Sequence, residues 1–95
     1  MNTTIIFYQE AINAVSEVTS LAKENILHSR TEQATHARYL LIQILSARLT
    51  DEAISSLLGI TRQAVNKARN HFDERCRGSG ELRQSYNLLS SQFPP

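Results

Sequence analysis

Residues 57–69 read LLGITRQAVNKAR, and this stretch decides how the fold is interpreted. Gly59 stands between two apolar residues, and Thr61 follows shortly before a run of long polar side chains. Glycine readily adopts the left-handed backbone of a helix C-cap or tight turn, and threonine is a good cap for the start of a helix. The stretch therefore predicts one helix that ends at Gly59 and a second that begins at Arg62.

The residues on both sides of this turn have the spacing of two short amphipathic helices. Thr50 can cap the first, whose apolar face comprises Ala53, Ile54, Leu57 and Leu58. In the second, expected over residues 61–75, the residues that point inward are Ala64, Val65, Ala68 and Phe72. Two short helices joined by three to four residues form a helix-turn-helix, which we predict at residues 51–72. Ser55 occupies a position of the first helix at which helix-turn-helix motifs more usually have alanine.

The opposite side of the second helix is polar and carries no carboxylate before Asp73. Arginine can bond guanine through two hydrogen bonds, and glutamine or asparagine can bond adenine in the same way. We therefore expect base contacts from Arg62, Gln63 and Asn66. The other candidate DNA-binding residues of this segment are Thr61, Lys67, Arg69 and Asn70, of which Thr61, Lys67 and Arg69 are expected to contact phosphates.

The rest of the chain predicts an all-α fold. Glycine occurs only at positions 59, 78 and 80 and proline only at 94 and 95, and no segment alternates with a period of two. Residues 34–49 form the most apolar segment. Their apolar side chains occupy a face broad enough for a central helix on which other helices pack. We predict one compact domain of five or six helices over residues 1–95.

Composition restricts the partners and the compartment. Ten Lys and Arg nearly balance nine Asp and Glu, so binding through bulk charge is not expected. The basic residues are concentrated, however, because residues 61–77 hold five of them against two acidic ones. Cys76 is the only cysteine, and no signal peptide or membrane-spanning stretch is evident. These features predict a cytoplasmic protein with no membrane partner.

No catalytic residue, metal site or cofactor is predicted. His71 and Cys76 are five residues apart and would face different ways on a helix. His28 and His36 are not accompanied by a cluster of further ligands with metal-binding spacing. The sequence "GSG" at 78–80 lacks the lysine of a phosphate-binding loop. We therefore do not expect an enzyme.

Residues 15–72 resemble the C-terminal DNA-binding domain of the bacterial replication initiator DnaA, in the Trp-repressor-like helix-turn-helix group. The similar stretches are VSEVTSLAKENILHSR, HAR with the apolar helix that ends in LT, DEAISSLLG and TRQAVNKAR. The resemblance implies the same helical DNA-binding fold. It also places Arg30 in the family's basic loop, and Arg38 where an arginine contacts the DNA backbone.

This chain departs from the family pattern at two places. It has one residue more between Arg38 and Leu49. The family's recognition signature, Asp-His-Thr-Thr-Val, is replaced by TRQAV at positions 61–65, where only the final valine matches. The family's DNA target is therefore not expected here, and the nucleotide-hydrolysing domain of the initiator is absent from these residues.

The predicted function is sequence-specific binding of double-stranded DNA, in the control of transcription or replication. The alternative is a protein-interaction module that uses the same fold without DNA, which the near-zero net charge favours. A surface on which Arg30, Arg38 and the residues 61–77 form one basic face would favour DNA. One motif reads only a few base pairs, so a homodimer is a candidate assembly.

Overall fold

The computed structural model describes residues 2–94, which contain seven α-helices and no strand. The helices are α1 (Thr3–Thr19), α2 (Lys23–His28), α3 (Glu32–Leu45), α4 (Asp51–Leu58), α5 (Arg62–Asn70), α6 (Phe72–Arg77) and α7 (Gly80–Ser90). The described part measures 37 × 27 × 24 Å. The predicted all-α, compact fold is confirmed, but the number of helices is seven instead of five or six.

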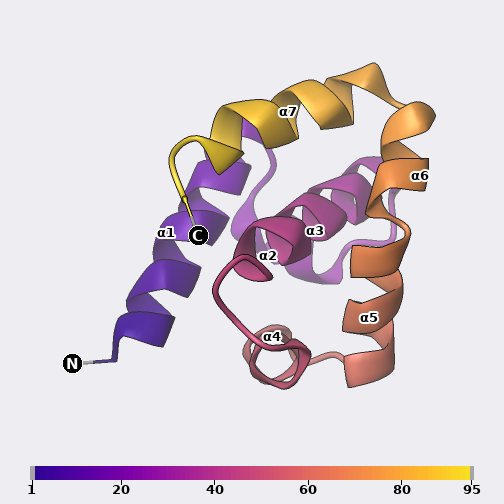
Figure 1. The fold of residues 1–95 in the computed structure, drawn as a ribbon. Coiled ribbons are helices and arrows are strands. Elements are labelled where there is room, and N and C mark those ends of the chain that lie inside the picture. The colour runs from indigo at the N-terminus through magenta and orange to yellow at the C-terminus, as the bar shows by residue number, and fades with distance from the viewer. Residues whose placement is uncertain (1, 95) are drawn as a thin grey trace.

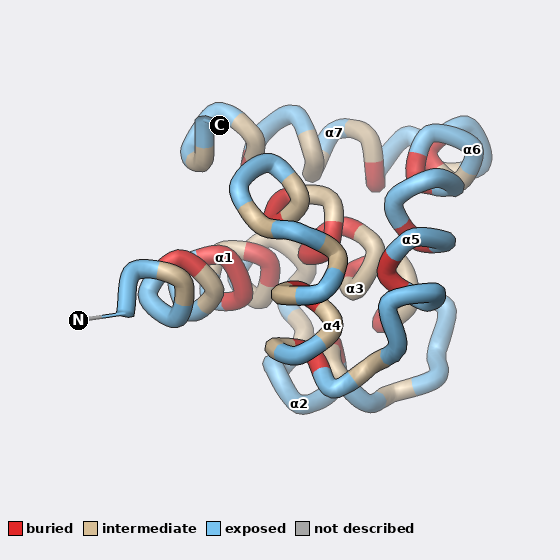
Figure 2. The backbone as a smooth tube through the Cα atoms, turned by 60° about the horizontal axis from the view of Figure 1, so that its bottom comes forward, coloured by how far each residue is buried: buried red, intermediate tan, exposed pale blue. Residues whose placement is uncertain are grey.

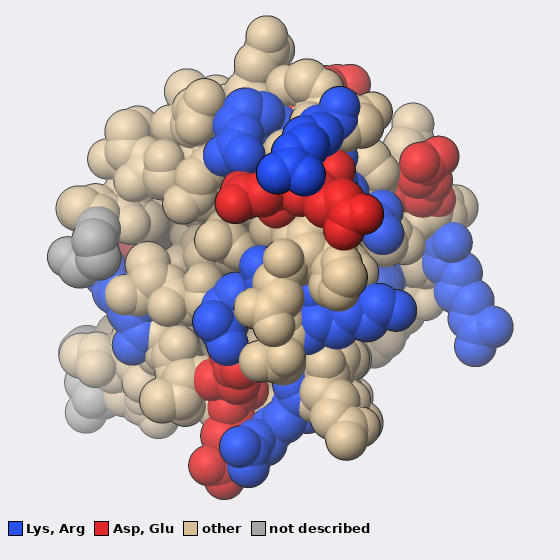
Figure 3. All heavy atoms as spheres, turned by 45° about the vertical axis from the view of Figure 1, so that its right-hand side comes forward, with Lys and Arg blue, Asp and Glu red and all other residues tan. Residues whose placement is uncertain are grey.

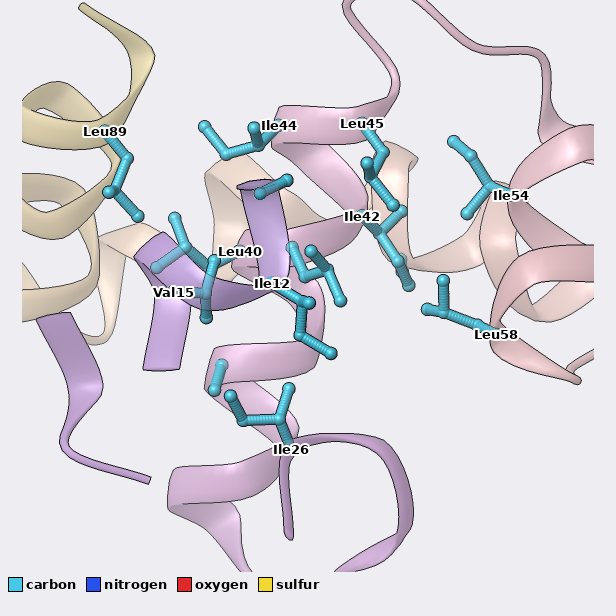
Figure 4. Packing of buried hydrophobic residues seen from close by; sticks show 14 of the residues in the cluster. Ile12, Val15, Ile26, Leu40, Ile42, Ile44, Leu45, Ile54, Leu58 and Leu89 are labelled. Atoms are coloured by element: carbon cyan, nitrogen blue, oxygen red, sulfur yellow. The ribbon is translucent and has the colours of Figure 1, made fainter. Parts of the chain in front are cut away.

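Helix α3 lies at the centre of the molecule, with α1, α2, α5, α6 and α7 packed against it (Figure 1). Seven of its fourteen residues are buried, because apolar side chains surround most of its circumference. Figure 4 shows Leu40, Ile42 and Leu45 of α3 among apolar side chains from the surrounding helices. The prediction that this segment is the buried helix is confirmed.

The C-terminal end of the chain packs against α1. The rings of Phe7 and Phe93 pack edge to face, with centroids 5.9 Å apart. Arg48, in the connection between α3 and α4, lies 4.6 Å above the Phe7 ring and donates two hydrogen bonds to the carbonyl of Pro94. This contact joins the C-terminal end to the connection that leads into α4.

The single helix expected over residues 61–75 is divided in two. α5 ends at Asn70, and α6 begins at Phe72 after a bend at His71, whose φ and ψ are −100° and 7°. The bend allows Phe72 to be buried against α7, where its ring meets Tyr86 edge to face with centroids 5.1 Å apart. A single straight helix would have to place Phe72 against α7 and, along the segment of α5, pack against α3 as well.

The buried side of α5 is narrower than predicted. Val65 and Ala68 are buried, whereas Ala64, which was expected to point inward, is exposed. Ala64 is four residues before Ala68 and therefore lies on the same side of the helix, but it stands in the first turn of α5, where only the later residues of the stripe are buried. Figure 2 shows the buried stretches on α3 and on the inner sides of its neighbours, with exposed residues along the outer turns of α5.

Candidate nucleic-acid interface

Helices α4 and α5 are joined by three residues, as the sequence predicted. Gly59 has a φ of 70° and a ψ of 30°, and its N–H donates to the carbonyl of Ser55 at 2.9 Å. The N–H of Ile60 donates to the same carbonyl at 3.1 Å, so the chain turns tightly. The Thr61 hydroxyl then accepts from the N–H of Ala64 at 3.0 Å and starts α5. The predicted end at Gly59 and start at Arg62 are confirmed.

Packing of this pair determines which side of α5 faces solvent. Ile54 and Leu58 of α4 and Val65 and Ala68 of α5 belong to the core cluster. The opposite side of α5 is exposed. It presents five of the predicted DNA-binding residues: Arg62, Gln63, Asn66, Lys67 and Asn70.

Four of the predicted DNA-binding residues line one shallow hollow. Thr61, Arg62, Gln63 and Asn66 surround a space of about 620 Å³ that is open to solvent, together with Asp51 from the first turn of α4. The structure therefore brings together the three residues predicted to contact bases. Asp51 was not predicted to lie among them. At the start of α4, its carboxylate also interacts favourably with the helix dipole.

Asp51 forms a two-pronged ion pair with Arg69 of α5. Nε and Nη2 of Arg69 donate to the two carboxylate oxygens at 3.1 and 2.8 Å, and Nδ2 of Asn66 lies 3.4 Å from Oδ2. The bond with Arg69 lowers the pKa of Asp51, and the same bond raises the pKa of Arg69. Both side chains are partly exposed, at 39% for Arg69 and 24% for Asp51. The charge of Arg69 is thus directed at α4.

A further hydrogen bond runs along α5 itself. Nδ2 of Asn70 donates to Oδ1 of Asn66 at 3.0 Å, between residues four apart on the same side of the helix. The amide of Asn66 therefore contacts a neighbour at each of its polar ends. Arg62 and Lys67, by contrast, form no ion pair with any other residue in the described part of the chain.

The two arginines suggested by the family resemblance have different surroundings. Arg30 is exposed between α2 and α3. Arg38 is partly buried, where Nε donates to the carbonyl of Ile26 at 2.9 Å and Nη2 donates to the carbonyl of Ser29. Arg38 therefore satisfies carbonyl groups at the C-terminal end of α2. A phosphate contact by the same side chain would have to use its remaining N–H groups.

Positive charge on the face around α5 and α6 is interrupted by carboxylates. Figure 3 shows Lys and Arg side chains on this face with Asp and Glu between them. Arg83 pairs with Asp73 at 3.0 Å, and the guanidinium of Arg75 lies 4.2 Å above the ring of Tyr39. The basic residues of segment 61–77 thus do not all face solvent as free charges.

Within residues 2–94, no group of three or more His, Cys, Asp or Glu side chains is arranged to hold a metal ion. Burial raises the pKa of the Cys76 thiol, so the reactive thiolate is disfavoured there. His71 lies beside Glu74, with Nδ1 and Oε2 3.1 Å apart, and forms no hydrogen bond with that thiol in the described part of the chain. None of the described helices is both long enough and apolar enough to cross a membrane.

No family model, curated protein or solved structure matches this chain. The resemblance to the DNA-binding domain of the replication initiator therefore stays a prediction that rests on the residues quoted for it.

Proposed function

We propose that α4, the turn at Gly59 and α5 form a helix-turn-helix through which the protein binds double-stranded DNA selectively. The observation that carries the proposal is the two-sided character of α5. Val65 and Ala68 anchor one side in the core, and the other side presents arginine, glutamine, asparagine and lysine to solvent. Such a helix is held rigidly while its polar side chains remain available to a ligand.

The dimensions and side chains of α5 suit the major groove. An α-helix with its side chains is about 10–12 Å across, and the groove is about 12 Å wide. Arg62 and Gln63, in the first turn of α5, carry the groups that bond guanine and adenine. The Thr61 hydroxyl accepts the capping bond, so its own hydrogen remains available to a phosphate. Lys67 is the second phosphate contact on this side.

The direct test is fluorescence anisotropy with random-sequence duplex DNA between about 50 and 200 mM salt. We expect wild-type affinity to fall steeply with salt, and Arg62→Ala to lose affinity and selectivity. Lys23→Ala is the matched control, because it removes an exposed basic residue from α2, outside the α4–α5 pair. Absence of wild-type binding at low salt would refute the proposal.

A protein-docking role is the second candidate, and the ion pairs favour it. Asp51 neutralises Arg69 and Asp73 neutralises Arg83, in a chain whose net charge is only +1. In that case the wild type would not bind DNA, or its DNA binding would be the same in Arg62→Ala and Lys67→Ala. The same polar surface would then contact a protein partner.

We further propose a regulatory role in transcription or replication, in the cytoplasm, with two copies on adjacent half-sites. One helix in the groove reads only a few base pairs, so a dimer would supply useful selectivity. Sedimentation velocity with and without the selected DNA tests this assembly. A complex containing one protein per duplex, at saturating protein, would contradict it.

A further inference from the structure

We propose that Asp51, held by Arg69, orients the side-chain amide of Asn66 and so makes Asn66 selective for adenine. The inference rests on the proposed function, since it assigns roles within the same surface of α5. Its basis is a continuous series of side-chain hydrogen bonds that joins α4 to α5, from Arg69 through Asp51 and Asn66 to Asn70.

The series has one firmly held end. Arg69 uses two nitrogens, Nε and Nη2, to bond separate oxygens of Asp51 at 3.1 and 2.8 Å. A two-pronged bond of this kind limits both rotation and displacement of the carboxylate. Asp51 is also the first residue of α4, so its backbone is part of a helix capped by Thr50. The carboxylate is therefore an acceptor at a defined position beside α5.

An ionised carboxylate only accepts hydrogen bonds, and this property determines which way the amide of Asn66 turns. Nδ2 of Asn66 faces Oδ2 of Asp51 at 3.4 Å, and Oδ1 of Asn66 accepts from Asn70 at 3.0 Å. Turning the amide over would place oxygen against carboxylate and nitrogen against nitrogen-bound hydrogen. Both contacts would be lost, so one orientation is favoured.

The favoured orientation leaves the groups that adenine requires. A primary amide has two N–H donors and two acceptor lone pairs, and each neighbour uses only one. One donor and one acceptor therefore remain, which match N7 and the N6 amino group of adenine. Arg69 is thus a positioning residue that acts on Asn66 through Asp51. Its two bonded nitrogens face α4 instead of a phosphate.

The test compares base preference position by position. After selection of the preferred sequence, competition anisotropy is measured for wild type, Asn66→Ala, Asp51→Asn, Arg69→Ala and Arg62→Ala. Glu52→Gln is the matched control, because it removes the neighbouring carboxylate, which forms no ion pair in the described part of the chain. Circular dichroism during heating checks that each variant folds.

We expect Asn66→Ala to identify an adenine-preferring position. Asp51→Asn and Arg69→Ala should each lower that preference by about tenfold, near the lower limit for a two-pronged base contact. Arg62→Ala should remove a guanine preference, and this guanine preference should remain in Asp51→Asn and Arg69→Ala. Arg69→Ala should not change the salt dependence of affinity, and Glu52→Gln should behave as wild type.

Three results would overturn the inference while leaving DNA binding intact. These are an unchanged adenine preference in Asp51→Asn, the absence of any adenine preference that depends on Asn66, and a salt slope lowered by about one in Arg69→Ala. The last would identify Arg69 as a phosphate contact. If Asp51→Asn does not fold, Arg69→Ala decides by the same readouts. Absence of DNA binding by the wild type would instead refute the proposed function itself.

Discussion

Among individual residues, Asp51 both stabilises the α4–α5 pair and lies among the polar side chains on the surface of that pair. Its carboxylate stands at the positive end of α4 and receives both prongs of Arg69. The bond lowers the pKa of Asp51, so the carboxylate stays ionised to lower pH than it would in the unfolded chain. A depressed pKa in the folded state means that the contribution to stability is complete above the ordinary value and is lost at lower pH.

The first prediction concerns pH. The stability difference between wild type and Asp51→Asn should be greatest near neutral pH. It should shrink as pH falls below about 4, the ordinary range of an aspartate, toward the lowered pKa. Urea unfolding midpoints between pH 7 and pH 2.5 measure it, at constant ionic strength. In an Arg69→Ala background the difference near neutral pH should be smaller. Equal midpoints for wild type and Asp51→Asn at pH 7 would show that the ion pair does not stabilise the fold.

The second prediction concerns the cap of α5. Thr61→Ala removes the acceptor for the Ala64 N–H and should lower the free energy of unfolding by about 0.5–2 kcal/mol. Thr61→Ser keeps the hydroxyl and serves as the control. Thermal unfolding followed by circular dichroism measures both, and an alanine variant as stable as the serine variant would contradict the capping role.

On the scale of helices, the turn between α4 and α5 depends on a backbone conformation that most residues avoid. Gly59 is the one glycine with a positive φ in the described part of the chain. Gly80, in contrast, is the first residue of α7, and no atom lies within contact distance of the position that a Cβ would take. We therefore expect the two positions to respond to the same substitution in opposite directions.

The third prediction compares these glycines. Gly59→Ala should lower the free energy of unfolding by about 1–2 kcal/mol, because an alanine at φ 70° brings its Cβ close to the following carbonyl. Gly80→Ala should raise it by about 0.4–1 kcal/mol, because alanine restricts the unfolded chain and fits the helix. Urea denaturation of both variants measures the difference. Destabilisation by Gly80→Ala would show that the start of α7 is not as open as described.

For the molecule as a whole, α3 supplies the surface on which the other helices are placed. Leu41 of α3 is fully buried, while Leu88 on the outer side of α7 is 56% exposed. Because five helices pack on α3, a cavity at its centre disturbs the position of α5 as well as the core.

The fourth prediction follows from this difference in burial. Leu41→Ala should lower the free energy of unfolding by about 2–5 kcal/mol, through lost apolar burial and the remaining cavity. Leu88→Ala should change it by no more than about 0.5 kcal/mol. Denaturant unfolding measures both values. A small effect of Leu41→Ala would mean that the centre of α3 can collapse around the missing side chain.

The parts of the structure predicted from sequence are those set by residues close together in the chain. Gly59 and Thr61 place the end of α4 and the start of α5 through bonds that span three to four residues. The apolar stripe of α3 was also readable, because helical periodicity alone identifies a helix that is covered on most sides. The exposure of Arg62 and Gln63 followed from the same periodicity.

The parts that were missed depend on contacts between distant residues. The bend at His71 follows from burial of Phe72 against Tyr86, fourteen positions further along the chain. Arg38 is engaged by a carbonyl twelve residues away, and Arg69 by a carboxylate eighteen residues away. The only sequence signal for the latter pair was an acidic residue at the start of one predicted helix and a basic residue on the next predicted helix.

The sequence by itself determined that the chain is helical, where α4 begins and ends, where α5 begins, and which side of α5 is polar. These properties depend on backbone geometry, capping and periodicity, which act within one or two helical turns. The tertiary structure decided which of the polar side chains remain available to a ligand. Arginine is long, flexible and always charged, so its partner is whichever acceptor the fold brings near. For Arg69 that acceptor is Asp51, and only the packing of α4 against α5 places it there.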